Sequence, residues 1–196
     1  MKQLTHVLIA LMAIWLFSCA SEQTGTEGQE SATTTQTEEA PSTAFEVTVT
    51  DPEAPSPRKM LKGTMGDIGV TIDYSSPAVK ERTIWGDLVP YGEVWRTGAN
   101  QATTIEFSKD VVISGQELPQ GKYAFFTIPF EGNWTLIFNR TANQFGAFNY
   151  DEKEDVTRVA VKPQPVAEST ENMEFMLDGN KVVLAWEKLK VAFPVE

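Results

Sequence analysis

Residues 173–187 read MEFMLDGNKVVLAWE, with two alternating runs on either side of Asp178-Gly179-Asn180. A two-residue hairpin turn of type I′ requires positive φ angles, which glycine and asparagine adopt readily. The flanking runs alternate in the manner of half-buried strands. The stretch therefore predicts a β-hairpin.

Segments with the period of a strand recur between turn residues along most of the chain from residue 59 onward. They lie at residues 60–65, 68–74, 103–107, 111–113, 122–128, 134–139, 156–161, 173–177, 181–187 and 189–195. Residues 129–133, which include Gly132, predict a second hairpin turn. No window keeps a helical period over three turns. We expect an all-β domain, an antiparallel β-sandwich or jelly roll of about ten strands.

One stretch, WGDLVPYGEVWRTGAN at residues 85–100, interrupts this pattern. It lies in the connection between Tyr74 and Thr103, whereas loops longer than about 12 to 15 residues are uncommon in compact domains and are often functional. Because the connection is rich in Trp, Ile, Val and Tyr, we expect an ordered loop, with a helical turn near residues 83–85. This loop is the predicted functional surface.

The amino-acid composition limits the kinds of site that the predicted domain can contain. The chain has 196 residues, 41% of them hydrophobic, which suits one globular domain with tails. Its formal net charge is -11 at pH 7, which argues against nucleic-acid binding because that requires a cationic patch. The only histidine is His6 and the only cysteine is Cys19. The predicted domain therefore lacks a histidine-dependent nucleophile, a Cys/His zinc site and a disulfide, and we expect no metal and no cofactor.

Residues 1–19 have the features of a lipoprotein signal peptide. The apolar run Val7–Phe17 is shorter than the roughly 20 residues that span a bilayer. Leu16-Phe17-Ser18-Cys19 resembles a bacterial lipobox, whose cysteine becomes the lipidated first residue of the mature protein. Ala20 follows where an Asp would often retain a lipoprotein in the inner membrane. We expect Cys19 to anchor the chain in the cell envelope, at the outer membrane, facing the periplasm or the surface.

Residues 20–55 are rich in Ser, Thr, Gln and Glu and contain no Lys or Arg. Such a segment cannot bury enough apolar surface to offset its ordering entropy, so we expect a disordered acidic linker followed by a domain over residues 56–196. Within the linker, Phe45, Val47 and Val49 alternate with polar residues. Residues 45–50 are therefore either an extra edge strand or an apolar patch in the linker.

Longer motifs resemble a known family. They are Ser56-Pro57-Arg58-Lys59, Asp73-Tyr74-Ser75, RTIWGDLVPYGEVWRTGAN at 82–100, LPQGKYAFFTIP at 118–129, NWTLIFN at 133–139 and FGAFNYDEKEDVTRVAVKP at 145–163. In this order they resemble the envelope lipoproteins called domain of unknown function 2911, from about Ser56 to Val195. Phe145 stands where tryptophan is expected. The resemblance implies a secreted or lipid-anchored β-rich domain with no assigned activity.

The long loop carries candidate ligand-binding residues. Aromatic rings stack on sugar faces, while amide and guanidinium groups hydrogen-bond hydroxyls, so these residue types together are typical of carbohydrate sites. The candidates are Trp85, Tyr91, Trp95, Arg96 and Asn100. Alternatively, Trp85 and Trp95 pack the loop onto the core, and Arg96 stacks on a ring or pairs with Asp87 or Glu93.

A second candidate group follows Phe145 and Phe148, in the sequence NYDEKED at residues 149–155. Asn149 and Tyr150 join the predicted ligand-binding set. The carboxylates could bind calcium or supply an acid/base pair, but Lys153 occupies a ligand position of the EF-hand pattern, and charge runs between strands are commonly solvated turns.

The sequence predicts a lipid-anchored, non-catalytic module that binds a glycan or another small polar ligand. One alternative is a carboxylate hydrolase using Asp87 or Glu93 with Asp151, which requires two carboxyl groups facing one pocket within about 10 Å. Another is a structural or protein-interaction role, signalled by a flat apolar patch. The oligomeric state and the ligand are not determined by the sequence.

Overall fold

A computed structural model describes residues 44–196, which contain eleven strands and one short 3-10 helix. The elements are β1 (Phe45–Asp51), β2 (Arg58–Met65), β3 (Ile68–Ser75), β4 (Thr103–Phe107), β5 (Val111–Ile113), β6 (Gln116–Leu118), β7 (Gly121–Ile128), β8 (Trp134–Asn139), η1 (Glu152–Glu154), β9 (Asp155–Val161), β10 (Gln164–Asp178) and β11 (Lys181–Pro194). All strand pairs in this part of the chain are antiparallel. The predicted all-β class is confirmed.

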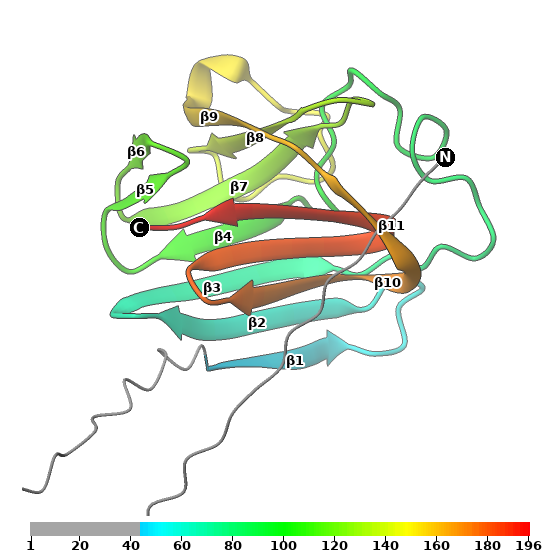
Figure 1. The fold of residues 1–196 in the computed structure, drawn as a ribbon, viewed down its shortest axis with the longest axis horizontal. Helices are drawn as coiled ribbons and strands as arrows, with labels where there is room; N and C mark the ends of the chain where they lie inside the picture. Colours follow the sequence, from blue (N-terminus) through cyan, green and yellow to red (C-terminus); the bar gives the residue numbers. More distant parts are fainter. Residues whose placement is uncertain (1–43) are drawn as a thin grey trace, which may run out of the picture. The chain divides into compact units, whose positions relative to one another are not determined.

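Two layers make a sandwich. Seven strands form one sheet in the order β1-β2-β3-β4-β7-β8-β9, and the β10–β11 hairpin lies across one of its faces (Figure 1). The β5–β6 hairpin extends this second layer, because the Val112 N–H donates to the Glu196 carbonyl at 2.7 Å and the Glu196 N–H donates back at 3.0 Å.

The inner face of the large sheet is apolar because its strands alternate. Phe125 of β7 contacts rings from both layers, with centroids 5.3 Å from Phe138 of β8, 6.2 Å from Phe175 of β10 and 5.7 Å from Phe193 of β11. All four rings are almost fully buried. Burial of such rings is the main term that holds two sheets together.

The outer face of the same sheet is largely polar between β2 and β7. One cross-strand row pairs Met60 with Asp73, Asp73 with Thr104, and Thr104 with Ala124. Since successive side chains of a strand point to opposite faces, this row lies opposite the apolar core. Toward β8 the outer face has a small apolar cluster of its own, Ala102, Ala124, Phe126 and Ile137, which the loops cover.

The predicted hairpin at residues 173–187 is confirmed. Asp178 pairs with Lys181 across the turn, and Gly179 has a φ of 58°. Both strands are longer than expected: β10 already begins at residue 164, and residues 181–194 form one strand. The register shifts on both sides of the Thr170–Glu187 pair, where extra residues of β10 bulge and Glu187 has a φ of 52°. The first half of β10 is mostly exposed, so it lacks the apolar alternation that marks a strand.

Residues 45–51 are β1, an edge strand, so the expected linker boundary at residue 55 is corrected for this segment. Phe45 pairs with Gly63 and Asp51 with Arg58, which gives the backbone groups of β2 their second set of partners. The predicted signal peptide, Cys19 and the predicted linker up to residue 43 lie outside the described residues. Within residues 44–196, no helix is long and apolar enough to cross a membrane.

The long connection, residues 76–102, is ordered but has no helical turn at residues 83–85. A compact turn forms instead, in which the Val89 N–H donates to Ile84 O and the Gly86 N–H donates to Val89 O, both at 2.9 Å. Further along, Trp95 exchanges two backbone hydrogen bonds with Thr127 of β7, at 2.8 and 2.9 Å. β4 pairs only with residues 121–125 of β7. The loop therefore pairs with the remaining end of β7, at Thr127.

Candidate ligand-binding site

Four tryptophans meet under the long loop. The Trp85 ring lies 5.9 Å from Trp95, 4.8 Å from Trp134 and 5.7 Å from Trp186, and Trp95 stacks on Trp186 at 5.7 Å. Trp95 is only 8% exposed, and Trp85 is partly buried against the main core. A ring in these surroundings has little free face for a sugar. The packing alternative therefore accounts for both predicted tryptophans.

The other predicted residues of the loop do not gather around the tryptophans. Arg96 is half-buried, and this burial lowers the pKa of its guanidinium group. Among the described residues it forms no ion pair, so it pairs with neither Asp87 nor Glu93. Tyr91 is exposed and lies against Gly86. Asn100 is exposed, and its carbonyl accepts a hydrogen bond from the Gly146 N–H at 2.9 Å. Through Asn100 the loop reaches residues 140–150.

Tyr150 belongs to a polar network on the outer face of the sheet. Its hydroxyl donates to the Asp155 carboxylate at 2.6 Å and accepts from Arg158 at 2.6 Å. Its ring lies 5.1 Å from Phe126. Burial, followed by the hydrogen bond to Asp155, raises the pKa of Tyr150 to about 12. Tyr150 is thus a structural anchor for its loop, whereas its neighbour Asn149 is exposed.

Asn139, at the end of β8, organises the segment that follows it. Its side chain is fully buried. The amide nitrogen donates to the Asp151 carbonyl at 3.0 Å and to Asp155 Oδ1 at 2.8 Å. The amide oxygen accepts from the Thr141 N–H and from Gln144 Nε2, both at 3.1 Å. One side chain therefore holds both ends of the loop and sets the position of Gln144.

Gln144 lines an open cavity on the outer face of the large sheet. The cavity has a volume of about 270 Å³ and is walled by β2, β3, β4, β7 and the segments around residues 101 and 144. Arg58, Asp73, Lys122 and Phe145 also line it. The Arg58 Nε lies 2.7 Å from Asp73 Oδ1, so an ion pair holds the guanidinium group at the cavity wall.

Two polar atoms of this cavity lack a protein partner. They are Arg58 Nη1, a donor, and Gln144 Oε1, an acceptor, and both are shielded from solvent. Gln144 is only 6% exposed. Buried polar atoms are hydrogen-bonded in nearly all native structures, so this donor and this acceptor require a partner from outside the chain, either an ordered water or a ligand group. The other such atoms in residues 44–196 belong to the tryptophan cluster and to Arg96.

An aromatic pair stands at the rim. Phe145 lines the cavity and is 59% exposed, and Phe148 is 84% exposed. Their rings stack with centroids 6.4 Å apart and planes 10° from parallel. Exposed large rings have faces free for contact with a ligand, in contrast to the buried tryptophans.

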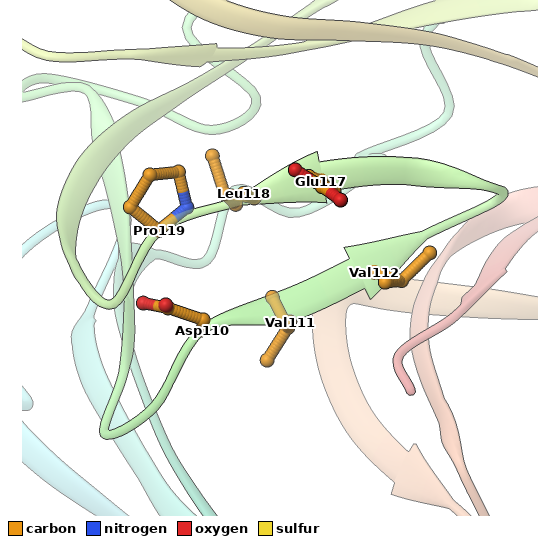
Figure 2. Close-up of a pocket in the computed structure, with 6 residues that line it drawn as sticks. All are labelled: Asp110, Val111, Val112, Glu117, Leu118 and Pro119. Carbon is orange, nitrogen blue, oxygen red and sulfur yellow. The ribbon is translucent and has the colours of Figure 1, made fainter.

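A larger cavity, of about 430 Å³, lies at the β5–β6 hairpin (Figure 2). Asp110 and Glu117 are the charged residues that line it, and the rest of its wall is Val111, Val112, Leu118 and Pro119. Asp110 is already engaged, because its Oδ1 accepts from the Gln120 N–H at 2.8 Å. A single hairpin forms the wall and none of its lining side chains is a free buried polar group, so the cavity by the Arg58–Asp73 pair is the better candidate.

The carboxylates of the hydrolase alternative are dispersed. Asp87 and Glu93 are exposed on the long loop, and Asp151 is exposed on another loop, where it caps η1 by accepting from the Lys153 N–H at 3.0 Å. Residues 44–196 contain no group of three or more acidic or other metal-ligating side chains that could hold a metal ion. The structure does not support the hydrolase alternative.

A family model described as "Protein of unknown function (DUF2911)" matches residues 56–195. The chain belongs to the DUF2911 family. No curated protein and no solved structure matches it. The DUF2911 match thus covers all elements from β2 to β11, including every residue of the cavity. The description of the family assigns no activity to it.

None of the residues that line the cavity of this DUF2911 domain was among the sequence candidates, and they include Arg58, Asp73, Lys122 and Gln144. The first three lie within motifs that carried the family resemblance, but none of the three is an aromatic or an amide beside aromatics. The signal available in the sequence was that Arg58, Asp73 and Lys122 belong to these motifs. The meeting of Arg58 with Asp73 depends on the pairing of β2 with β3, which the local sequence does not specify.

Proposed function

We propose that this protein is a lipid-anchored, non-catalytic binding module of the cell envelope, which takes a glycan or another small polar ligand on the outer face of its large sheet. One observation carries the proposal: Arg58 and Gln144 line the same cavity, and their Nη1 and Oε1 atoms have no hydrogen-bond partner within residues 44–196. Both atoms are shielded from solvent, so a sugar hydroxyl reaches them after a small movement of the two side chains, accepting from the first and donating to the second. The stacked rings of Phe145 and Phe148 supply an apolar platform at the rim.

The envelope location follows from the signal peptide and Cys19. Several acyl chains give a stable anchor where a single chain binds only marginally. The acidic segment between the anchor and β1 supports the role of a tether, because its composition is that of a solvated chain. On this proposal the domain samples ligands near the membrane surface.

The test is isothermal titration of the full chain, purified in a polyoxyethylene detergent free of sugar headgroups, with a panel of neutral and acidic saccharides. Phe145→Ala removes the exposed ring that lines the cavity and is expected to weaken the binding that is found by about 3- to 10-fold, which corresponds to the loss of one ring contact. Phe130→Ala is the matched control, because Phe130 is also exposed but does not line the cavity. The proposal fails if no saccharide binds, or if both variants weaken binding equally.

A second candidate function, association between copies of the chain, is favoured by β1. This edge strand is exposed along its whole length, and Phe45, Val47 and Val49 project from one face. The opposite edge strand, β9, is covered by β6, whose Glu117 carbonyl accepts from the Thr157 hydroxyl at 2.9 Å. Exposed apolar edge strands are templates for pairing with another chain.

A second copy fits this edge in an antiparallel register centred on Thr48. Val47 of each copy then lies opposite Val49 of the other, and Glu46 lies opposite Thr50, so no two acids face each other directly. Light scattering on the full chain in detergent tests the pairing. Val47→Lys should convert a dimer to a monomer, whereas a wild-type monomer at all concentrations would exclude this function.

A further inference from the structure

The candidate cavity is one end of a longer groove. A second cavity, of about 240 Å³, shares Asp73, Thr104 and Lys122 with the first. It continues over Met60, Lys62, Thr71 and Glu106 on the outer face of the sheet. The two cavities therefore adjoin along a common wall.

Strand positions fix the length of this groove. The first cavity is lined by Arg58 of β2 and by Ala102 just before β4, and the second continues to Lys62 of β2 and Glu106 of β4. Each residue of an antiparallel strand rises about 3.4 Å, so the four steps from Arg58 to Lys62 span roughly 14 Å. A ligand that fills the groove is longer than a single sugar ring, and it lies along the strands.

The charge of the groove is opposite to that of the whole chain. Arg58, Lys62 and Lys122 line it, against Asp73 and Glu106, whereas the chain carries a formal net charge of -11. Arg58 is neutralised by its pair with Asp73. Lys62 and Lys122 are exposed and form no ion pair within residues 44–196. Glu106 lies opposite Lys122 in the strand register, so three cations against two carboxylates leave the groove one net positive charge, and both lysine ammonium groups remain without an ion-pair partner in the described part of the chain.

We infer that the ligand is an acidic oligosaccharide, a linear chain of uronic acid units, with one carboxylate near Lys122 and another toward Lys62. This rests on the proposed binding function and specifies its ligand. Carboxylates accept charge-assisted hydrogen bonds from ammonium groups, and hydroxyls of the unit beside Gln144 satisfy its free oxygen. The Phe145 and Phe148 rings cover one end of the groove and the lysines continue along it.

The test compares three ligands by isothermal titration of the full chain in detergent: trigalacturonate, its fully methyl-esterified form and monomeric galacturonate. We expect the acidic trimer to bind at least about 10-fold more tightly than the ester and the monomer. Its affinity should fall as salt rises, because exposed charges are screened within about 10 Å at 0.1 M salt. The ester is a matched control, since it keeps the backbone and loses the charges.

Three lysine variants test which ammonium groups interact with the carboxylates of the ligand. Lys122→Gln should weaken both the monomer and the acidic trimer by about 3- to 5-fold, the range for one exposed ion pair. Lys62→Gln should weaken the trimer alone. Lys188 is an exposed residue of β11, in the other layer, so Lys188→Gln makes the same change in net charge and should alter neither affinity.

The outcomes separate this inference from the proposed function. Equal affinity for the acidic and esterified trimers would overturn the inference and leave a binding module for neutral glycans. Equal weakening by Lys62→Gln and Lys188→Gln would also overturn it, because binding would then follow net charge and not the groove. If no saccharide binds at all, both the inference and the proposed function fail.

Discussion

Replacing Asn139 with alanine tests the idea that one buried amide holds the loop of residues 140–155 and the wall of the cavity. The side chain is fully buried and makes four hydrogen bonds, three to uncharged groups and one to the Asp155 carboxylate. Alanine removes all four and adds no new partner. The substitution therefore isolates the contribution of the amide.

The size of the effect follows from that count. A hydrogen bond between uncharged groups contributes about 0.5 to 1.5 kcal/mol net, and one to a charged group about 1.5 to 3 kcal/mol. Some of the loss is recovered because Thr141 is exposed and its N–H can bind water, whereas the Asp155 side chain is only 6% exposed. We expect Asn139→Ala to lower the free energy of unfolding by about 3 to 5 kcal/mol.

Urea unfolding followed by tryptophan fluorescence measures this change, because the four-tryptophan cluster reports on both layers. With a urea dependence of about 1 to 3 kcal/mol per molar, the midpoint should fall by at least about 1 M. Coincident transitions by circular dichroism would justify a two-state treatment.

Asn149→Ala is the matched control. Asn149 is an asparagine of the same loop but is exposed, so its removal should change the free energy of unfolding by less than about 0.5 kcal/mol. The reasoning is refuted if Asn139→Ala costs less than about 1 kcal/mol, since the loop would then hold without the buried amide.

Three further predictions concern other parts of the molecule. Trp186→Ala should lower the free energy of unfolding by about 3 to 5 kcal/mol, because a large cavity opens beneath the long loop; a loss near zero in urea unfolding would show that the cluster does not support the fold. Tyr150 should make the wild type lose stability as pH rises from about 10 to about 12, because its pKa is about 12 when folded and near 10 when unfolded. Tyr150→Phe lacks this component, so parallel stability curves of the two proteins would contradict the assignment. Cys19→Ser should leave the membrane fraction and take up no labelled palmitate, and its retention in membranes would rule out the lipid anchor.

None of the residues that the sequence predicted to bind a ligand lines the candidate cavity. Trp85 and Trp95 were predicted to bind a ligand, with packing against the core as the alternative. Aromatic residues in a long loop are typical of both roles, and the local sequence does not distinguish them. Burial decides between them, and Trp95 is 8% exposed. Phe145 and Phe148 were noted only as aromatics before the acidic run, yet they are the exposed rings.

Apart from β6 and the exposed first half of β10, the sequence by itself determined the strands and turns, because alternation and the turn residues Gly179 and Asn180 act between near neighbours in the chain. It also determined that histidine and cysteine chemistry lies outside the domain. Only the tertiary structure decided that Arg58, Lys122 and Gln144 meet in one groove. Their contact depends on register across β2, β3, β4 and β7, where a slip of one residue would turn each side chain to the other face of the sheet.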